Sequence, residues 1–277
     1  MKLYLLKQKP SPGMSKRMFD AASKKLNLNL EYNNLVTPED YYQKVLRSLM
    51  DDHDVRGFNV TIPYKVKIRA DVVADDDVLA CGAVNCVRVD HEKNKFLGYN
   101  TDWKGIYKPL QSKAIHSAIV AGAGGASRAA IYALKKLDVQ SIHLFNRTQK
   151  SAKEIQQIFP SIEVHALDTL DSYLIKEKTD LLINTTPLGM NPNPRTCLPV
   201  TVEALKNCST VFDIVYKPLQ TKLLTLAKNA GCECINGLEM LVEQHIENVK
   251  IWDMPKKRGI IEHLKTFKSD EQDNTLA

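Results

Sequence analysis

One stretch of the chain, SAIVAGAGGASRAAIYALKKL at residues 117–137, constrains the fold more than any other. Its apolar start is typical of a buried strand, and the residues after its glycines have helical periodicity. Gly122, Gly124 and Gly125 lie in the turn between the two segments. Such a turn lets a pyrophosphate approach the backbone at a helix N-terminus, where free N–H groups favour negative charge. The stretch therefore predicts a dinucleotide site, with a plain glycine-rich turn as the alternative.

Strand-like and helix-like segments alternate on both sides of this stretch, which predicts an α/β fold. Before it, strands are expected at residues 2–7, 30–36 and 57–63, and residues 83–100 have the pattern of a hairpin. After it, the alternating segments are those of a doubly wound sheet.

The length of the chain and these two runs of alternation indicate two domains. A chain of 277 residues is long enough for two ordinary domains. The first run closes near residue 100, and the pattern becomes helical again in the last part of the chain. We expect one domain to comprise residues 1–101 and 238–277, and the other to comprise residues 102–237.

The composition is that of a soluble globular protein, with 44% hydrophobic and 25% charged residues. No apolar run approaches the roughly 18 residues that a transmembrane helix needs. The N-terminus also lacks the pattern of a signal peptide. We therefore expect a cytoplasmic protein that does not enter a membrane, and either a monomer or a homodimer is compatible with the sequence.

The net charge of +6 is a mild excess of basic residues. Lysines and arginines are scattered, and the only tight cluster is PKKRG at residues 255–259. This distribution does not predict a nucleic-acid partner. It suits a small anionic substrate or a phosphorylated cofactor, whose local concentration a positive field raises.

The six cysteines do not predict disulfides or a metal site. A chain of this length builds its own hydrophobic core, and none of the cysteine spacings is a CxxC motif. Cys232 and Cys234 flank Glu233, but no pair of histidines is near them in the sequence. We therefore expect reduced thiols and no bound metal.

The end of the strand after the glycine-rich turn indicates which dinucleotide binds. An acid about 20 residues downstream would bind the ribose 2′-hydroxyl of NAD, whereas the 2′-phosphate of NADP needs cations. Here the strand ends at Asn146, followed by Arg147, Thr148 and Lys150. A guanidinium, a hydroxyl and an ammonium are suitable donors to a phosphate. This pattern predicts NADP, with an exposed polar loop as the alternative.

A candidate acid–base pair precedes the second run of alternating strands and helices. Lys65 follows the apolar strand in GFNVTIPYK, at the start of a helical pattern, and Asp102 follows the hairpin at the joint between the two runs. An aspartate beside a lysine holds the ammonium in place, while partial burial lowers its pKa. Such a pair can exchange protons near neutral pH. The alternative for Lys65 is an ordinary surface charge at a strand-to-helix turn.

Eight motifs carry a resemblance to a known family, and they are, in chain order, NVTIPYK, GAVNC, GYNTD, GAGGAS, NRT, NTTPLGM, DIVYKPLQT and GLEMLVEQ. Their order and approximate spacing resemble those of shikimate dehydrogenases, over residues 1–252. The resemblance implies an N-terminal α/β substrate domain with a mixed sheet and a Rossmann-type doubly wound NADP-binding domain. It also implies reversible reduction of 3-dehydroshikimate to shikimate by NADPH, in the pathway to aromatic amino acids.

The resemblance also implies roles for individual residues. Lys65 and Asp102 match the catalytic pair of the family. Residues that match positions binding the substrate are Ser15, Thr61, Asn85, Tyr216 and Gln244. Residues that match positions binding the cofactor are Gly122, Ala123, Gly124, Gly125, Ala126, Asn146, Arg147, Thr148, Lys150, Thr185, Met190, Ile214, Gly237 and Met240.

The chain departs from the family where two serines of an S-x-S-P motif bind the substrate carboxylate. That motif aligns with Gly13-Met14-Ser15-Lys16, so the first serine is Gly13 and the proline is Lys16. Losing a hydroxyl that binds a carboxylate costs about 1.5–3 kcal/mol of binding. Either Lys16 replaces the lost donor, or the site prefers quinate or another hydroxylated cyclic acid. A catalytically silent nucleotide-binding regulator is a further alternative, although such a protein has no need of Lys65 and Asp102.

Overall fold

The computed structural model describes residues 1–10 and 13–276, and its contacts divide the chain into two compact units. The first unit comprises residues 1–101 and 244–277, and the second comprises residues 102–243. The predicted domains differ from these units only at residues 238–243. The assignment of one domain to the substrate and the other to the cofactor stays a prediction.

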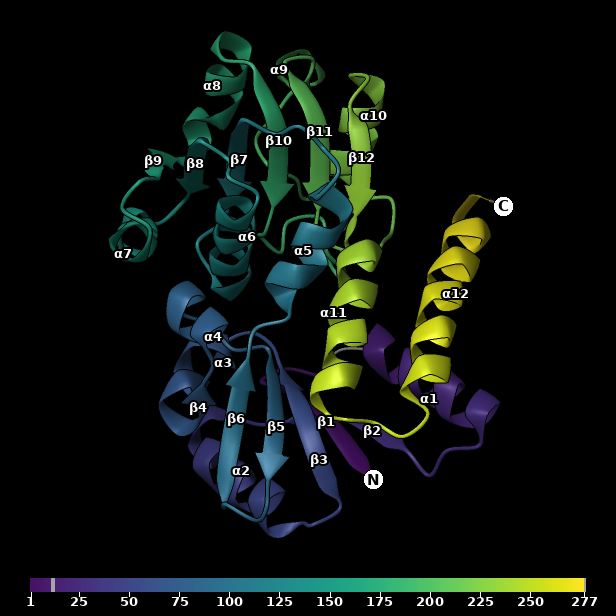
Figure 1. Ribbon diagram of the computed structural model, residues 1–277. Coiled ribbons are helices and arrows are strands. Elements are labelled where there is room, and N and C mark those ends of the chain that lie inside the picture. The colour runs from purple at the N-terminus through teal and green to yellow at the C-terminus, as the bar shows by residue number, and fades with distance from the viewer. Residues whose placement is uncertain (11–12, 277) are drawn as a thin grey trace. The chain divides into compact units, whose positions relative to one another are not determined.

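The first unit contains a six-stranded mixed sheet (Figure 1). Its strands, in spatial order, are β2 (Glu31–Val36), β1 (Lys2–Lys7), β3 (Val55–Val60), β5 (Cys86–Asp90), β6 (Lys95–Tyr99) and β4 (Val73–Ala74). The first three are parallel, whereas β5 is antiparallel to both β3 and β6. The predicted mixed sheet and the predicted hairpin are therefore confirmed.

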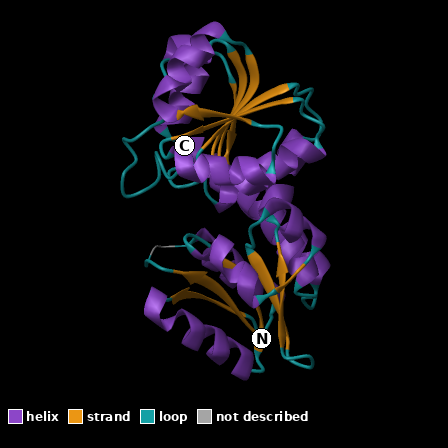
Figure 2. Cartoon of the chain, turned by 90° about the vertical axis from the view of Figure 1, so that its left-hand side faces the viewer, coloured by secondary structure: helices purple, strands orange, loops and turns teal. Residues whose placement is uncertain are grey.

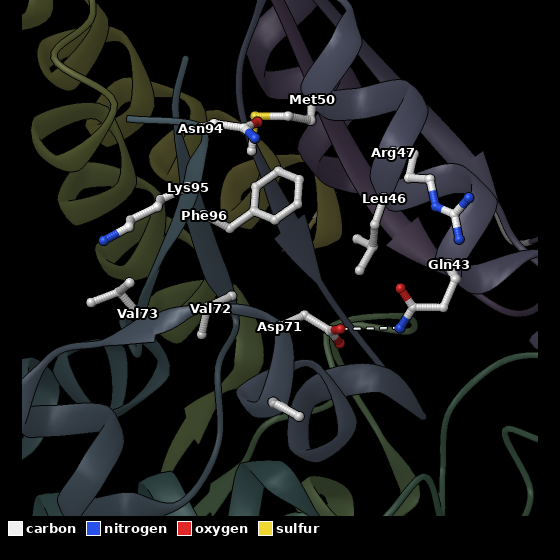
Figure 3. A pocket seen from close by; sticks show the side chains of 11 residues that line it. Gln43, Leu46, Arg47, Met50, Asp71, Val72, Val73, Asn94, Lys95 and Phe96 are labelled. Carbon is white, nitrogen blue, oxygen red and sulfur yellow. Dashed lines mark hydrogen bonds between the residues drawn. The ribbon is translucent and has the colours of Figure 1, made fainter. Parts of the chain in front are cut away.

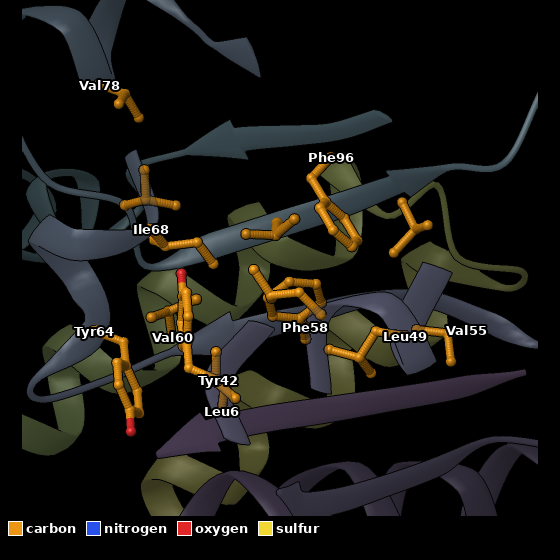
Figure 4. Packing of buried hydrophobic residues seen from close by; sticks show 14 residues of the cluster. Leu6, Tyr42, Leu49, Val55, Phe58, Val60, Tyr64, Ile68, Val78 and Phe96 are labelled. Atoms are coloured by element: carbon orange, nitrogen blue, oxygen red, sulfur yellow. The ribbon is translucent and has the colours of Figure 1, made fainter. Parts of the chain in front are cut away.

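Helices cover this sheet, and one of its faces carries a large apolar cluster (Figure 4). The helices of the unit are α1 (Met14–Leu26), η1 (Glu39–Tyr41), α2 (Tyr42–Asp51), α3 (Tyr64–Lys67), η2 (Ile68–Asp71), α4 (Asp76–Cys81) and α12 (Lys257–Leu276), together with part of α11 (Gly237–Ile251). Phe58 and Val60 from β3 lie in the cluster with Leu46 and Leu49 from α2. Burial of this apolar surface is the main force that holds α2 on the sheet.

A second layer of packing depends on close approach of Trp252 to β3. The indole Nε1–H donates to the Val87 carbonyl at 2.9 Å. A Cβ atom on Gly57 would lie 2.3 Å from the same indole nitrogen, so only glycine fits at this position. Phe19 stacks on Tyr32 at 4.9 Å between ring centroids, and it also contacts the Trp252 ring. The aromatic layer thus joins α1 and the end of α11 to the sheet.

The second unit contains a six-stranded parallel sheet. Its strands, in spatial order, are β12 (Glu233–Asn236), β11 (Cys208–Asp213), β10 (Thr179–Asn184), β7 (Ser117–Ala121), β8 (Ser141–Asn146) and β9 (Glu163–Ala166). The chain proceeds from β7 to one edge and then returns to β10 to build the other half. This order is that of a Rossmann-type doubly wound fold, which confirms the predicted fold class.

Helices lie on both sides of this parallel sheet (Figure 2). They are α5 (Asp102–Leu110), α6 (Gly125–Lys136), α7 (Gln149–Ile158), η3 (Leu167–Thr169), α8 (Leu170–Lys176), α9 (Val202–Leu205), α10 (Lys222–Asn229) and the first part of α11, residues 237–243. The strands β7, β10 and β11 are almost entirely buried, as parallel strands covered on both faces must be. Within the described part of the chain, no helix is long and apolar enough to cross a membrane.

Candidate functional site

The predicted cofactor residues lie at or after the carboxyl ends of strands in the parallel sheet. Gly122 begins the segment after β7, Arg147 follows β8, Thr185 follows β10, Ile214 follows β11 and Gly237 follows β12. The strands β7 and β10 are neighbours, and the direction of winding reverses between them. In open α/β sheets, this switch point at the carboxyl ends is where nucleotides bind.

The glycine-rich turn after β7 has the backbone geometry of a phosphate-binding turn. Gly122 has φ of +109°, and a Cβ atom there would lie 2.7 Å from the Thr185 hydroxyl. Both the conformation and the space require glycine. Gly124 is exposed at the N-terminus of α6, and a Cβ at this residue would meet no atom within 4 Å. This open space in front of the N–H groups of a 12-residue helix fits a pyrophosphate.

Exposed donors follow β8, where the 2′-phosphate of NADP is predicted to bind. Arg147, Thr148 and Lys150 are all exposed. The Asn146 amide donates to the Thr148 carbonyl at 2.8 Å and fixes the turn that leads into α7. The structure adds Gln149, whose amide donates to the carbonyls of Asn146 and His165 at 3.0 and 3.1 Å. Gln149 is the first residue of α7, and nothing in the local sequence indicated that its side chain would hold this turn.

A buried carboxyl group fixes the turns after β10 and β11. Asp213 is fully buried, and it accepts hydrogen bonds from Thr221 Oγ1 at 2.7 Å and Asn184 Nδ2 at 2.9 Å. Asn184 Oδ1 in turn accepts from the backbone N–H of Thr186 at 3.0 Å. Burial raises the pKa of Asp213 to about 6, because it disfavours the charged form more than the hydrogen bonds favour it. This network holds the predicted cofactor residue Thr185 between two anchored neighbours.

The residues predicted to line the nicotinamide end differ in exposure. Met190 has 44% of its surface exposed, whereas Met240 is buried in α11. Ile214 is partly exposed. Tyr216, predicted to contact the substrate, is also partly exposed, and desolvation raises the pKa of its phenol. Tyr216 is therefore neutral at pH 7 and able to donate a hydrogen bond.

In the first unit, Lys65 lies on the short helix α3, directly after β3 and Thr61. Tyr64 anchors this segment, because its buried hydroxyl donates to the Thr37 carbonyl at 2.5 Å and its N–H donates to the Thr61 carbonyl. The Lys65 carbonyl accepts from the Val84 N–H at 2.8 Å, and the side chain is partly exposed. The turn therefore fixes the backbone of Lys65 and leaves its side chain accessible.

Asp102 is the first residue of α5 and is 1% exposed. It belongs to the second unit, whereas Lys65 belongs to the first. The pairing of these two residues stays a prediction.

Two predicted substrate residues of the first unit, Asn85 and Gln244, are joined by a hydrogen bond. Asn85 is 2% exposed, and its amide Nδ2 donates to Gln244 Oε1 at 3.1 Å and to Thr101 Oγ1 at 2.9 Å. Its Oδ1 accepts from the Thr101 backbone N–H at 2.6 Å. Asn59 donates to the Asn85 carbonyl at 3.1 Å. The structure thus adds Asn59 and Thr101, two buried polar residues that the sequence prediction left out.

The same network continues to Ser15 through two residues of α11. The Thr101 hydroxyl donates to Asn248 Oδ1 at 2.7 Å, and Asn248 Nδ2 lies 3.1 Å from His245 Nδ1. His245 Nε2 lies 2.9 Å from Ser15 Oγ. Thr101, Asn248, His245 and Ser15 are all buried. A continuous buried network therefore joins the predicted substrate residues Ser15, Asn85 and Gln244.

The protonation of His245 follows from its partners. Burial lowers the pKa of His245 to about 3, so the imidazole is neutral at pH 7. Asn248 Nδ2 can only donate, so His245 Nδ1 accepts and the proton is on Nε2. Nε2–H then donates to Ser15 Oγ, which leaves the serine hydroxyl proton free for another acceptor. This arrangement makes Ser15 a hydrogen-bond donor suited to a carboxylate.

Gly13, which takes the place of the first serine of the family motif, lies beside the side-chain amide of Asn34. Gly13 precedes α1, and a Cβ at this residue would lie 3.2 Å from Asn34 Oδ1. Asn34 Oδ1 is buried and has no hydrogen-bond partner among the described residues. Lys16, the predicted replacement, pairs with Asp20 at 2.9 Å and donates to the Tyr32 carbonyl at 3.1 Å. The Lys16 ammonium therefore already has two partners within α1 and β2.

A cavity of about 460 Å³ in the first unit lies away from all of these residues (Figure 3). It opens between α2 and the β6–β4 edge of the sheet, and Figure 3 shows Gln43 hydrogen-bonded to Asp71 beside it. Its lining comprises Gln43, Leu46, Arg47, Met50, Ala70, Asp71, Val72, Val73, Asn94, Lys95 and Phe96. None of the predicted site residues is among them, so we do not assign this cavity to the candidate site.

The chain is similar to known proteins in sequence. Residues 7–87 match the family model of the shikimate dehydrogenase substrate binding domain. The chain is 36% identical over 241 residues to the shikimate dehydrogenase (NADP(+)) of Thermotoga maritima, a match that covers 86% of this chain and 88% of the relative.

Solved structures are similar over nearly the whole chain. The crystal structure of shikimate dehydrogenase from Thermotoga maritima has a TM-score of 0.84 at 33% identity, and it covers 96% of this chain and 99% of that chain. The shikimate 5-dehydrogenase of Thermus thermophilus, solved in complex with NADP(H) and shikimate, has a TM-score of 0.80 at 27% identity, with the same coverage.

Proposed function

Because the chain belongs to the shikimate dehydrogenase family, we propose that it catalyses the NADPH-dependent, reversible reduction of 3-dehydroshikimate to shikimate. The observation that carries this proposal is the similarity to a relative of that activity and cofactor over 86% of the chain. The product would serve the formation of chorismate and the aromatic amino acids.

The residues of the second unit fit the proposed cofactor. The turn at Gly122 and Gly124 offers N–H groups and open space to a pyrophosphate, and Arg147 and Lys150 offer positive charge to a 2′-phosphate. When bound, NADPH supplies the hydride for the reduction. Thr185, Met190, Ile214, Gly237 and Met240 are assigned to the nicotinamide end on the family resemblance.

The network of the first unit supports binding of a hydroxylated carboxylic acid. Ser15 presents a hydroxyl donor for the carboxylate, because His245 occupies its acceptor side. Asn85 and Gln244 are pre-positioned by their mutual hydrogen bond, and we assign them with Thr61 and Tyr216 to the substrate hydroxyls. Fixed donors and acceptors of this kind reject substrates that lack the matching hydroxyl groups.

Lys65 is assigned the proton transfer. During reduction, negative charge develops on the keto oxygen, and an ammonium beside that oxygen both stabilises the charge and donates the proton. In the reverse direction the neutral amine accepts the proton of the shikimate hydroxyl. Asp102 is assigned as the second member of the catalytic pair on the family resemblance. We also infer that residues 1–101 and 238–277 form the substrate domain and that residues 102–237 form the NADP domain. We further infer a cytoplasmic location and either a monomer or a homodimer.

The activity is tested by incubating purified protein with shikimate and NADP⁺ and following the absorbance of the reduced nicotinamide. We expect a steady rise, with 3-dehydroshikimate as the product. No rise with shikimate, together with tight binding of NADP⁺, would instead indicate a silent nucleotide-binding regulator. A faster rise with quinate than with shikimate would move the assignment to the quinate-type alternative that Gly13 raises.

A further inference from the structure

Three potential metal ligands meet at the β8–β9 edge of the second unit, and the proposed reaction uses none of them. They are His143 from β8 and Glu163 and His165 from β9. In the parallel pairing of these strands, His143 lies opposite Glu163, and His165 is two residues further along β9. Alternate residues of a strand share a face, so all three side chains emerge on the same side of the sheet.

The distances between the potential ligand atoms are close to the edge lengths of a tetrahedron of ligands around a metal ion. His143 Nδ1 lies 3.1 Å from His165 Nε2 and 3.6 Å from Glu163 Oε2, and the third distance, His165 Nε2 to Glu163 Oε2, is 3.7 Å. Tetrahedral zinc with ligands at its usual bond lengths of about 2.0–2.2 Å requires ligand atoms about 3.3–3.6 Å apart. The three atoms therefore need to move by only a few tenths of an ångström.

The histidine rings are held in the orientation that this geometry requires. His143 Nε2, the nitrogen that faces away from the cluster, lies 2.7 Å from Ser141 Oγ and 3.1 Å from Tyr173 Oη. With Nδ1 bound to a metal, Nε2 carries the proton and donates it to these oxygens. Histidines that bind metals almost always have such a partner on the other nitrogen. The His165 ring stacks on Phe145 at 4.7 Å between centroids, which fixes the second imidazole.

The cluster is buried at His143 and open at its other side. The His143 side chain is only 12% exposed, which places one of the potential ligands inside the protein. His165 is 26% exposed and Glu163 is 70% exposed, so the cluster opens to solvent on the glutamate side. An ion can enter from that side and keep water as its fourth ligand.

We propose that His143, Glu163 and His165 form a binding site for a divalent ion of the zinc class, with three protein ligands and one open position. Two imidazoles and a carboxylate suit zinc and similar transition metals, whereas magnesium and calcium prefer oxygen ligands throughout. The ion joins the edge strand β9 to β8. It also lies next to the NADP loop, because the Gln149 amide is bonded to the carbonyls of His165 and Asn146.

The proposal is tested with metal-free protein by titrating Zn²⁺ against a chromophoric chelator and by recording the spectrum of the Co²⁺ form. We expect one site per chain and the visible absorption of tetrahedral Co²⁺ with nitrogen and oxygen ligands. His143→Gln, Glu163→Gln and His165→Gln should each weaken Zn²⁺ binding at least about tenfold. His116→Gln, which changes an exposed histidine of the same unit outside the cluster, should leave the affinity unchanged.

Tyr173→Phe separates the metal site from a simple pair of hydrogen-bonded histidines. Removing the hydroxyl that orients His143 should weaken Zn²⁺ binding by roughly tenfold, whereas Ser172→Ala on the same helix should not. Equal Zn²⁺ affinity in the wild type and the three ligand variants would overturn the proposal. Sulfur-to-cobalt charge-transfer bands would overturn it too, because they would place the ion at thiols such as Cys232 or Cys234.

X-ray absorption of the Zn²⁺-loaded wild type provides a test that does not depend on the folding of any variant. Two imidazoles and two further oxygen ligands, from Glu163 and water, are expected around the ion. A first shell that contains sulfur, or one without imidazole scattering, would overturn the proposal.

Discussion

The candidate substrate site of the first unit is built mainly from side chains, whereas the candidate cofactor site of the second is built mainly from backbone. In the first unit, the site consists of buried side chains that hydrogen-bond one another, from Ser15 through His245, Asn248 and Thr101 to Asn85. In the second, the site consists of backbone at strand ends and at the N-terminus of α6. A side-chain network fails when one member is removed, whereas a backbone site fails only when the backbone conformation changes.

The largest effect is expected from Lys65→Ala, which removes the proposed proton donor. We expect kcat for shikimate oxidation to fall by roughly 10²–10⁴-fold, the usual contribution of a positioned acid or base. Binding of NADPH, measured by fluorescence, should hardly change. Lys67→Ala on the same short helix is the control, since Lys67 pairs with Glu39. A Lys65→Ala enzyme with wild-type kcat would refute the assignment.

Gly122→Ala and Gly124→Ala form a matched pair for the backbone site. Gly122 has a positive φ and no space for a Cβ, whereas Gly124 has φ of −107° and open space. We expect Gly122→Ala to lower the free energy of unfolding by about 1–3 kcal/mol through backbone strain. Gly124→Ala should change it far less. Urea unfolding without cofactor measures both, and equal effects would mean that the conformation of the turn is not what requires Gly122.

His245→Leu is the corresponding test of the side-chain network. It leaves the partner atoms of Ser15 and Asn248 unsatisfied, which costs about 1–3 kcal/mol. Because Ser15 then loses its orientation, we expect KM for shikimate to rise roughly tenfold while KM for NADP⁺ stays constant. A merely structural defect would change both constants or neither. His245→Gln, which keeps an N–H donor, should recover part of the loss.

Asp213 gives the second unit a pH dependence that an amide would lack. Its pKa is about 6 in the folded protein against an ordinary value of 3.8, so the folded state binds the proton more tightly. The stability from this carboxyl is fully present below about pH 4 and is lost as the pH rises through 6. Relative to Asp213→Asn, the wild type should lose up to about 3 kcal/mol of unfolding free energy between pH 4 and pH 7.

The measurement is the pH series of urea unfolding for both proteins. His245 contributes a slope of opposite sign, because its pKa is lowered in the folded protein, but it is present in both and cancels in the difference. A constant difference between the two proteins would show that Asp213 is already ionised throughout this range.

The smallest effect is expected from Lys16→Ala. The Lys16 ammonium already bonds Asp20 and the Tyr32 carbonyl, and exposed ion pairs contribute at most about 1 kcal/mol. We expect KM for shikimate to change less than about fivefold. Asn34→Leu, which removes the unsatisfied amide beside Gly13, should change KM more. A larger effect of Lys16→Ala would restore the idea that Lys16 replaces the missing serine.

Local patterns predicted the fold and the cofactor site. Alternation of apolar strands and amphipathic helices indicated the doubly wound sheet, and the glycine turn at residues 122–125 marked the strand end where the cofactor is expected. Both features are carried by short stretches of sequence, because strand, turn and helix follow one another along the chain.

The side-chain networks were not predicted, because their members are distant in the sequence. His245 and Ser15 are separated by 230 residues, and neither has a neighbour that reveals the contact. His143 lies 22 residues before His165, so the spacing resembles no metal motif, and only the pairing of β8 with β9 brings them together. Similarly, Asn59 lies between Phe58 and Val60 in β3, and its partners Tyr32 and Asn85 come from other parts of the chain.

The measurement that most directly tests the central claim is kcat/KM for four combinations, shikimate or quinate with NADP⁺ or NAD⁺. A shikimate dehydrogenase with the network at Ser15 and the basic loop at Arg147 should have its highest value for shikimate with NADP⁺. A highest value for any other combination would contradict the assignment of substrate or cofactor, and no turnover in all four would contradict the assignment as an enzyme.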